Sequence, residues 1–315
     1  MSDIHLLAVS KLAPLYASQL RGYTVHDRLH DTDPAALAAV APQIRGIAAS
    51  GESKVSAALI AQLPALEVIS VMGVGYDGVD VAAAIKRGVR VTHTPNVLND
   101  DVADLALALM LSAARQIPAA DRYVRGGLWP QGAMPLARKM SGSRLGLVGM
   151  GRIGQAIATR ALAFGMSVAY HARSERPGLP YRYHATAAGL AAQSDFLVVI
   201  TPGGADTRHL INAEVLRALG HKGILVNVAR GSVVDEAALI DALEQGVIAG
   251  AGLDVFENEP HVPERLLALA KVVLTPHIGS ATGQTRQAMA DLAVANLAAH
   301  FAGQPLLSPV PECQP

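Results

Sequence analysis

A short apolar strand that ends in closely spaced glycines sets the strongest limit on how this chain folds. Arg144–Val148 predicts the strand, a helix is expected over 153–164, and Ser167–His171 predicts a second strand. Glycines between a strand and a helix allow a tight turn and expose helix N–H groups to a phosphate. This βαβ context favours a dinucleotide site over an ordinary glycine turn. Its expected residues are Gly149, Gly151, Arg152, Ile153 and Gly154.

The residues after the second strand indicate which dinucleotide binds. The chain continues His171-Ala172-Arg173-Ser174, without the acidic residue that binds the ribose 2′-hydroxyl of NAD. A carboxylate there would repel a 2′-phosphate, whereas Arg173 offers a bidentate grip and Ser174 a hydroxyl donor. We therefore expect NADP(H) as the preferred cofactor and NAD(H) as the alternative. The competing structural interpretation is a solvated loop arginine at position 173.

Length, charge and cysteine content exclude several classes of protein. The 315 residues are enough for two domains, and the 51% apolar content suits parallel sheets covered by helices. The 26 basic and 26 acidic residues balance, which argues against nucleic acid or an anionic membrane as partner. The single cysteine, Cys313, excludes an internal disulfide, and the N-terminus lacks a basic segment typical of signal peptides. We expect a cytoplasmic protein without a membrane span.

The first part of the chain predicts a parallel sheet of its own. Short apolar segments alternate with helical stretches there, with strands expected at 5–9, 23–25, 44–49, 66–71 and 89–92. The fourth of these segments is followed by Met72-Gly73-Val74-Gly75-Tyr76-Asp77-Gly78. Glycines at a strand end can present backbone N–H groups to an anion, although they also occur in purely structural turns.

A long helix and an irregular arm follow the first sheet. The helix is expected over 100–114, with Asn99 or Asp100 as its cap, and would carry the chain into a second domain. The arm, around Gly126-Gly127-Leu128-Trp129-Pro130, contains the only tryptophan. Trp129 is expected at an interface or in a substrate pocket, with local packing as the alternative.

Further strands are expected at 196–200, 223–228, 249–254 and 272–274, which with the two around the glycine loop make a six-stranded sheet. Ligands of such sheets bind outside the carboxyl ends of the strands. Those ends carry Thr201, Pro202, Val228, Ala229, Arg230, Asp254, Glu259, His277 and Gly279. We expect these residues to converge beside the glycine loop. The alternative is that they act separately, with Arg230 in a surface ion pair, Glu259 as a loop acid and His277 as a loop histidine.

Several longer motifs occur in a fixed order: Val74-Gly75-Tyr76-Asp77, Thr94-Pro95-Asn96-Val97-Leu98, the glycine loop, 227–231, 252–260 and Thr275-Pro276-His277. With these motifs the chain resembles the D-isomer-specific 2-hydroxyacid dehydrogenases over nearly its whole length. Arg173-Ser174 and the Leu128-Trp129-Pro130 arm are most similar to the NADPH-preferring glyoxylate/hydroxypyruvate reductases of that family.

The resemblance implies an α/β architecture of two Rossmann-like or flavodoxin-like domains, each with a parallel sheet. Residues 1–97 and 289–315 would form the substrate domain, and residues 98–288 an inserted dinucleotide-binding domain. Two crossing helices would join the domains, and closure would exclude water. The resemblance also implies a homodimer that associates through the cofactor domain, with Trp129 reaching the partner's active site, and no metal.

The same resemblance implies reduction of a small 2-keto acid to a D-2-hydroxy acid. His277 would donate the proton, and Glu259 would orient and stabilise its imidazolium. Arg230 would bind the substrate carboxylate and polarise the carbonyl, with the N–H groups of Val74 and Gly75 on the carboxylate's far side. Leu98 and Trp129 would shape the pocket, and Asp254 would lie near the nicotinamide carboxamide. The cofactor would contact the glycine loop, His171, Arg173, Ser174 and eight of the strand-end residues: Thr201, Pro202, Val228, Ala229, Arg230, Asp254, His277 and Gly279.

Other activities remain open at this point. The alternative substrates are hydroxyphenylpyruvate, D-lactate and phosphoglycerate, although we expect a longer chain for a phosphoglycerate dehydrogenase with a regulatory domain. A formate dehydrogenase is disfavoured because that pattern has Gln where Glu259 stands. A dinucleotide-sensing binding protein with this fold is the alternative from a different class.

Overall fold

The computed structural model describes residues 4–314 and divides them into two compact units. The first unit contains residues up to Leu98 together with the segment from Thr282 onward, and the second contains Asn99–Ala281. Each unit is built on one parallel sheet, so the predicted α/β class with two parallel sheets is confirmed. The boundary that the sequence suggests near residue 289 lies inside a helix of the first unit and remains a prediction about where the two domain roles divide.

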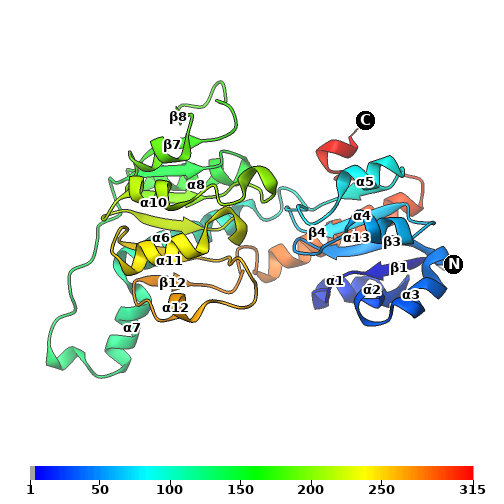
Figure 1. Ribbon diagram of the computed structural model, residues 1–315, viewed down its shortest axis with the longest axis horizontal. Helices are drawn as coiled ribbons and strands as arrows, with labels where there is room; N and C mark the ends of the chain where they lie inside the picture. The colour runs from blue at the N-terminus through cyan, green and yellow to red at the C-terminus, as the bar shows by residue number, and fades with distance from the viewer. Residues whose placement is uncertain (1–3, 315) are drawn as a thin grey trace. The chain divides into compact units, whose positions relative to one another are not determined.

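The first unit has a five-stranded sheet in the order β2-β1-β3-β4-β5, covered by helices (Figure 1). Its elements are β1 (His5–Ala8), α1 (Pro14–Gln19), β2 (Thr24–Asp27), α2 (Leu29–Thr32), α3 (Pro34–Val40), β3 (Ile44–Ser50), α4 (Ala57–Gln62), β4 (Val68–Met72), α5 (Val81–Lys86), β5 (Arg90–Thr92) and α13 (Gly283–Phe301). Strand β4 is buried along its whole length, as expected for a parallel strand with both faces covered.

The second unit has a seven-stranded sheet in the order β12-β11-β10-β9-β6-β7-β8. Its elements are α6 (Asn99–Arg115), α7 (Ile117–Arg125), β6 (Arg144–Val148), α8 (Arg152–Ala163), β7 (Ser167–His171), β8 (Arg182–His184), α9 (Ala187–Ala191), β9 (Phe196–Val199), α10 (Ala213–Leu219), β10 (Ile224–Asn227), α11 (Glu236–Glu244), β11 (Gly250–Leu253), α12 (Glu264–Leu267) and β12 (Val272–Leu274). Short 3-10 turns lie at Ala41–Gln43, Trp129–Gln131, Ala205–Thr207, Gly231–Val233 and Pro311–Cys313.

The expected count of six strands in this sheet is wrong, because β8 adds a seventh at the edge. Its residues, Arg-Tyr-His, carry no apolar run that would indicate a strand. The strand forms by pairing with β7, where Tyr170 lies opposite Tyr183 and their rings are 5.5 Å apart. The expected helix caps Asn99 and Asp100 are also wrong, since both lie inside the first turn of α6.

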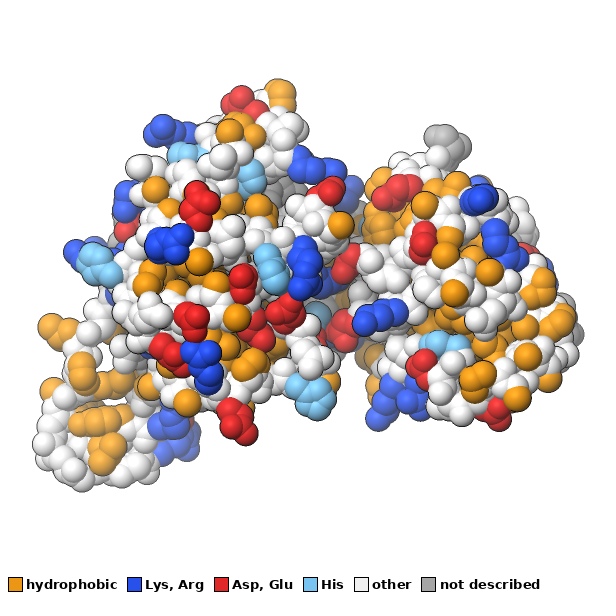
Figure 2. Space-filling view, viewed as in Figure 1, with side chains coloured by type: hydrophobic (Ala, Val, Ile, Leu, Met, Phe, Trp, Pro, Cys, Tyr) orange, Lys and Arg blue, Asp and Glu red, His pale blue; other side chains and the backbone are white. Residues whose placement is uncertain are grey.

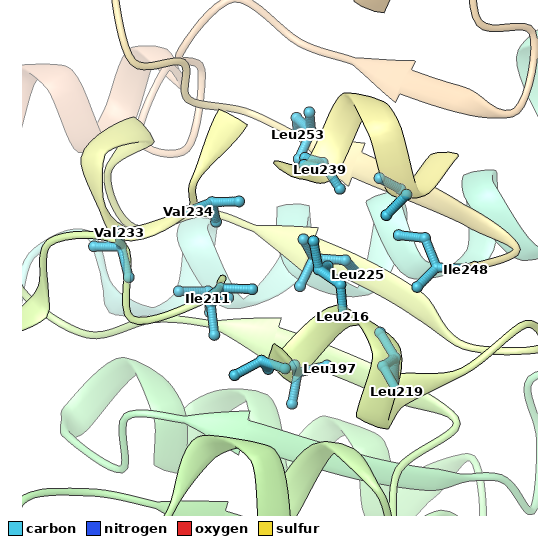
Figure 3. Packing of buried hydrophobic residues seen from close by; sticks show 14 of the residues in the cluster. Leu197, Ile211, Leu216, Leu219, Leu225, Val233, Val234, Leu239, Ile248 and Leu253 are labelled. Atoms are coloured by element: carbon cyan, nitrogen blue, oxygen red, sulfur yellow. The ribbon is translucent and has the colours of Figure 1, made fainter. Parts of the chain in front are cut away.

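A large apolar core covers one face of the seven-stranded sheet (Figure 3). Leu197 and Leu225 from β9 and β10 meet Leu216 of α10 and Leu239 of α11, and all four side chains are almost fully buried. Burial of each such side chain stabilises the fold by roughly 1.5–3 kcal/mol. Helix α6 packs against β10 and β11 in the same unit.

A glycine in β11 allows α6 to lie close to the sheet. A Cβ atom at Gly252 would lie 2.9 Å from the Cβ atom of Leu109 in α6. This close approach explains why a residue that is unfavourable in strands occupies the middle of β11.

No single helix among residues 4–314 is long and apolar enough to cross a membrane. One bent pair, α6 with α7, meets the length and composition test when its two helices are joined across a 58° bend.

A buried polar side chain attaches the C-terminal segment to the first unit. Asn296 of α13 is 1% exposed, and its Oδ1 accepts hydrogen bonds from the backbone N–H groups of Leu307 and Ser308, both at 3.0 Å. Its Nδ2 donates to the Ser308 hydroxyl at 2.8 Å and to the Leu292 carbonyl at 2.9 Å. The amide therefore makes four hydrogen bonds, which is its full capacity.

Replacing Asn296 with Ala leaves two N–H groups without their acceptor in a buried site. We expect Asn296→Ala to lower the free energy of unfolding by about 2–4 kcal/mol in urea denaturation, because each orphaned buried donor costs roughly 1–3 kcal/mol. Gln287→Ala on the exposed side of the same helix is the control, with an expected change within about 0.5 kcal/mol. Equal effects of the two substitutions would contradict the role given to Asn296.

Candidate active site

Each of the three glycines of the motif, two between β6 and α8 and the third in the first turn of α8, has its own structural reason. Gly149 has φ of +110°, and a Cβ atom there would lie 2.6 Å from the Ile200 carbonyl oxygen. A Cβ atom at Gly154 would lie 2.5 Å from the Gly149 carbonyl oxygen. At Gly151, by contrast, no heavy atom lies within 4 Å of the added Cβ. Two glycines thus permit close packing, and the third keeps the space before the helix open.

The N-terminus of α8 fits a dinucleotide pyrophosphate. Gly151 is the N-cap of this 12-residue helix, and no side chain caps it. The first N–H groups of a helix have no partners within the helix, and its dipole favours an anion at that end. Arg152 next to them is exposed and Ile153 is half-buried. The open space at Gly151 and the uncapped donors are the features that a bound phosphate requires.

The end of β7 presents the residues expected to distinguish NADP from NAD. The Nδ1 atom of His171 contacts the His184 carbonyl oxygen of β8 at 3.0 Å, which orients the histidine ring. Arg173 and Ser174 are exposed, and neither makes a hydrogen bond or ion pair with any other residue that the structure describes. An exposed guanidinium and hydroxyl beside the glycine loop fit a 2′-phosphate.

Parallel strands place the remaining candidates at one edge of the sheet. Thr201 and Pro202 follow β9, and Val228, Ala229 and Arg230 follow β10. The Asn227 side chain shapes the second turn, because its Oδ1 accepts from the Ala229 N–H at 3.0 Å and its Nδ2 donates to the Arg230 carbonyl at 2.9 Å. A Cβ atom at Gly231 would lie 1.9 Å from the Phe256 carbonyl carbon, so glycine lets this turn lie against the loop after β11.

His277 and Glu259 form the central pair of the site. The His277 Nδ1 atom lies 2.7 Å from Glu259 Oε2, and the other carboxylate oxygen accepts from the Phe256 N–H at 2.9 Å. Because a carboxylate only accepts, Nδ1 is the protonated nitrogen of the ring. Burial raises the pKa of Glu259, but its hydrogen bonds from His277 and Phe256 and the charges of His277 and Arg230 outweigh burial and lower its pKa overall. The pair therefore favours an ionised glutamate.

Asp254 holds the loop that carries His277. Its Oδ1 accepts from the Thr275 hydroxyl at 2.7 Å and the Ile278 N–H at 2.8 Å, and its Oδ2 accepts from the Gly279 N–H at 2.8 Å. The side chain is almost fully buried, and this burial raises the pKa of Asp254 against the opposing effect of its hydrogen bonds. The expectation that Asp254 lies near a nicotinamide carboxamide remains a prediction.

The backbone of His277 adopts the left-handed region, with φ of +51°. This conformation is uncommon for residues other than glycine and persists only where surrounding contacts enforce it. The backbone N–H of His277 donates to the Asp254 carbonyl at 2.9 Å, and the hydrogen bonds of the Asp254 carboxylate fix the two following residues. The loop thereby directs the imidazole at Glu259.

The residues expected to bind substrate lie in different local settings. Val74 and Gly75 form a half-buried loop after β4 of the first unit, and Leu98 is buried at the end of that unit's first segment. Trp129 lies in the arm of the second unit with 67% of its surface exposed, so the alternative of local packing is wrong.

Sequence reasoning missed a polar cluster around Glu257. Arg208 and His209 each approach a Glu257 carboxylate oxygen at 3.1 Å, and the Glu257 N–H donates to Glu236 at 3.2 Å. These contacts connect the loops after β9 and β11 with the start of α11. Arg208 and His209 are neighbours, but Glu236 and Glu257 lie in two other segments of the chain, so no local spacing indicates the cluster.

Comparisons with known proteins identify the family of this chain. Residues 107–279 match the model of the D-isomer specific 2-hydroxyacid dehydrogenase, NAD binding domain. Hydroxyphenylpyruvate reductase of Plectranthus scutellarioides is 51% identical over 274 residues, which cover 87% of this chain and 88% of that protein. Glyoxylate/hydroxypyruvate reductase A of Arabidopsis thaliana is 50% identical over 267 residues, which cover 85% of each chain.

A solved structure is similar over almost the full length. It is the NADPH-dependent glyoxylate/hydroxypyruvate reductase of Sinorhizobium meliloti in complex with NADP and malonate, with a TM-score of 0.93, 48% identity and coverage of 99% of this chain and 98% of that one. The chain belongs to the D-isomer-specific 2-hydroxyacid dehydrogenase family, which confirms the resemblance inferred from its motifs.

The lowered pKa of Glu259 makes its contribution to stability dependent on pH. A carboxyl group whose folded-state pKa lies below its ordinary 4.5 stabilises the fold above that value, and this contribution is lost as the pH falls through the folded-state pKa. We expect wild type to unfold with a higher free energy than Glu259→Gln near neutral pH, and the difference to shrink in acid. Urea denaturation at a series of pH values measures it, and a difference that grows with acidity would contradict the assignment.

Proposed function

We propose that this protein is an NADPH-dependent reductase of small 2-keto acids, with glyoxylate and hydroxypyruvate as substrates and D-2-hydroxy acids as products where the product is chiral. The observation that carries the proposal is the 2.7 Å contact between His277 and Glu259 at the carboxyl edge of the dinucleotide-binding sheet. Reduction of a ketone needs a proton donor near neutral pH, and a histidine paired with a carboxylate meets that need.

The cofactor is held by the glycine loop and the end of β7. The N–H groups at the start of α8, beside Gly151 and Arg152, bind the pyrophosphate, and Arg173 with Ser174 binds the 2′-phosphate. The reduced nicotinamide supplies a hydride to the carbonyl carbon. NADP(H) is the preferred cofactor because no acidic residue at this strand end repels the phosphate.

Arg230 binds the substrate carboxylate and polarises the carbonyl. A guanidinium stays protonated at every physiological pH and can grip a carboxylate with two hydrogen bonds. The backbone N–H groups of Val74 and Gly75 bind the same carboxylate as neutral donors. Leu98 and Trp129 limit the size of the substrate side chain.

His277 delivers the proton to the carbonyl oxygen from Nε2. Its Nδ1 contacts Glu259, so the ring orientation is set and the imidazolium is stabilised by the adjacent carboxylate. After the transfer the imidazole is neutral. Its Nδ1 proton remains on the ring, hydrogen-bonded to Glu259. Hydroxyphenylpyruvate is included among the substrates to be assayed, because the relative from Plectranthus scutellarioides is named for it.

The first test measures NADPH oxidation by the purified protein with glyoxylate, hydroxypyruvate, hydroxyphenylpyruvate and pyruvate. We expect turnover with the first two, slower turnover with NADH, and a kcat about 10² to 10⁴ lower in His277→Gln because the proton donor is lost. NADPH binding to this variant, followed by fluorescence, separates a loss of cofactor affinity from the loss of the proton donor. Unchanged kcat in His277→Gln would remove this residue from the mechanism, and no turnover with any substrate would favour a binding protein.

A second copy of this chain is the partner that we propose for the arm of the second unit. Large apolar side chains are exposed there: Ile117 (50%), Val124 (54%), Leu128 (42%), Trp129 (67%) and Leu136 (101%). Figure 2 shows apolar side chains gathered over α7 and the arm. A groove of about 490 Å³, lined by residues of α6, α7 and 134–141, lies beside them. Exposed apolar area of this extent marks an interaction surface.

A homodimer has an expected mass of twice 32.7 kDa in sedimentation equilibrium. We expect Trp129→Asp combined with Leu136→Asp to shift the protein toward the monomer, because charges would have to be buried without partners. Leu15→Asp, at an exposed leucine of the first unit, is the matched control and should leave the mass unchanged. A monomeric wild type would refute the dimer. A cytoplasmic location stays a prediction from the sequence.

A further inference from the structure

In the loop Gly73–Gly75 after β4, the carbonyl groups of Gly73 and Val74 are hydrogen-bonded, and the amides of Val74 and Gly75 are available. The Gly73 carbonyl accepts from the Thr94 N–H at 2.8 Å, and the Val74 carbonyl lies 3.0 Å from Nδ1 of His93. Within residues 4–314, the N–H groups of Val74 and Gly75 donate to no other atom, although both residues are half-buried. Half-buried amides without an acceptor suit an anionic ligand.

The contact with His93 determines where the Gly75 amide points. A carbonyl oxygen can only accept, so Nδ1 of His93 carries the proton of this hydrogen bond. The Val74 carbonyl and the Gly75 N–H belong to one planar trans peptide group and therefore point in opposite directions. When the carbonyl is held by His93, the Gly75 N–H is directed away from the histidine.

His93 is itself fixed by the C-terminal segment. Its backbone N–H donates to the Ser308 carbonyl at 3.1 Å, and its carbonyl accepts from the Ser308 hydroxyl at 2.6 Å. Ser308 is in turn bonded to Asn296 of α13 at 2.8 Å. His93 is only 9% exposed, so its imidazole has little freedom to leave the Val74 carbonyl.

Tyr76 also contacts His93 and so supports the position of the imidazole that holds the Val74 carbonyl. Its ring meets the His93 ring edge-on, with centroids 5.2 Å apart and an interplanar angle of 86°. Its hydroxyl donates to Glu312 at 3.1 Å. Burial, together with the nearby Glu312 carboxylate, raises the pKa of Tyr76 to about 12, so the hydroxyl keeps its proton at neutral pH.

We propose that His93 is a positioning residue for substrate binding: its Nδ1–H holds the Val74 carbonyl so that the Gly75 N–H is directed at the substrate carboxylate. This inference rests on the proposed function, in which that amide binds the carboxylate. The carboxylate does not change charge during reduction, so the amide binds substrate and transition state alike. Loss of the arrangement raises KM and leaves kcat nearly unchanged.

Two substitutions separate the hydrogen bond from the bulk of the ring. In His93→Asn the side-chain amide nitrogen is bonded to Cγ, as Nδ1 is in histidine, and can donate in its place. The leucine side chain of His93→Leu has no donor. We expect His93→Leu to raise KM for glyoxylate about tenfold or more, because a hydrogen bond to a charged group is misdirected, with kcat within about threefold of wild type. His93→Asn should stay within about threefold of wild type in both constants.

The control is His300→Leu, which removes another histidine contact of the same unit, the 3.1 Å contact with Glu67. Glu67 precedes β4, whereas the loop Gly73–Gly75 follows this strand. The KM of His300→Leu should equal that of wild type. Thermal unfolding and NADPH affinity are measured for all variants. If His93→Leu does not fold, His93→Gln, whose amide lies one bond further out, takes its place with the same expected rise in KM.

A readout that needs no turnover keeps this inference separate from the proposed function. Oxalate is titrated into the ¹⁵N-labelled protein with NADP⁺ present, and the Gly75 amide signal is followed. We expect this signal to shift in wild type and in His93→Asn at similar oxalate concentrations. In His93→Leu the same shift should require an oxalate concentration at least about tenfold higher. An equal response of all variants, or an equal rise in KM for His93→Asn and His93→Leu, would overturn the role of His93. A wild type without turnover would defeat the proposed function alone.

Discussion

The parallel direction of all seven strands in the second unit is the constraint on which its candidate site depends. Parallel strands bring their carboxyl ends to one edge of a sheet, where helix N-termini also begin. Residues that are far apart in the chain, from Gly149 to His277, therefore end at the same edge. The apolar core formed by β9 to β11 with α10 and α11 holds these strands in place, and with them the loops that follow the strands.

A buried carboxylate, Asp254, and a half-buried one, Glu259, lie at this edge, and their pKa values are shifted in opposite directions. Burial dominates at Asp254, which bonds mainly to neutral backbone and hydroxyl donors, so its pKa is raised. At Glu259 the neighbouring imidazole and the charge of Arg230 outweigh burial, so its pKa is lowered. Asp254 thus shapes the loop that holds His277 in a left-handed conformation, and Glu259 places an ionised carboxylate 2.7 Å from the His277 imidazole.

The loop after β4 in the first unit is shaped differently, and within residues 4–314 the N–H groups of its Val74 and Gly75 donate to no other atom. A continuous set of hydrogen bonds runs from Asn296 through Ser308 to His93 and on to the Val74 carbonyl. Buried polar networks whose members are all bonded rigidify the structure around them. The C-terminal segment therefore contributes to the shape of a loop more than two hundred residues earlier in the chain. His93 and Ser308, which are bonded to each other, are 215 residues apart.

Much of the fold and of the candidate site could be predicted from the sequence, because apolar runs report burial and glycines report backbone constraint. Strands β6, β7 and β12 have the expected bounds, and the φ of Gly149 explains the glycine motif. The order of strand ends also indicated that Arg230, Glu259 and His277 belong to one sheet edge. Strand β8 could not be predicted, since its three residues become a strand only by pairing with β7. The hydrogen bonds of Asp254, the cluster at Glu257 and the contact of His93 with Val74 were decided by tertiary structure alone. Each joins segments from separate elements, and the direction of such a side chain is set by the packing around it rather than by its neighbours in sequence.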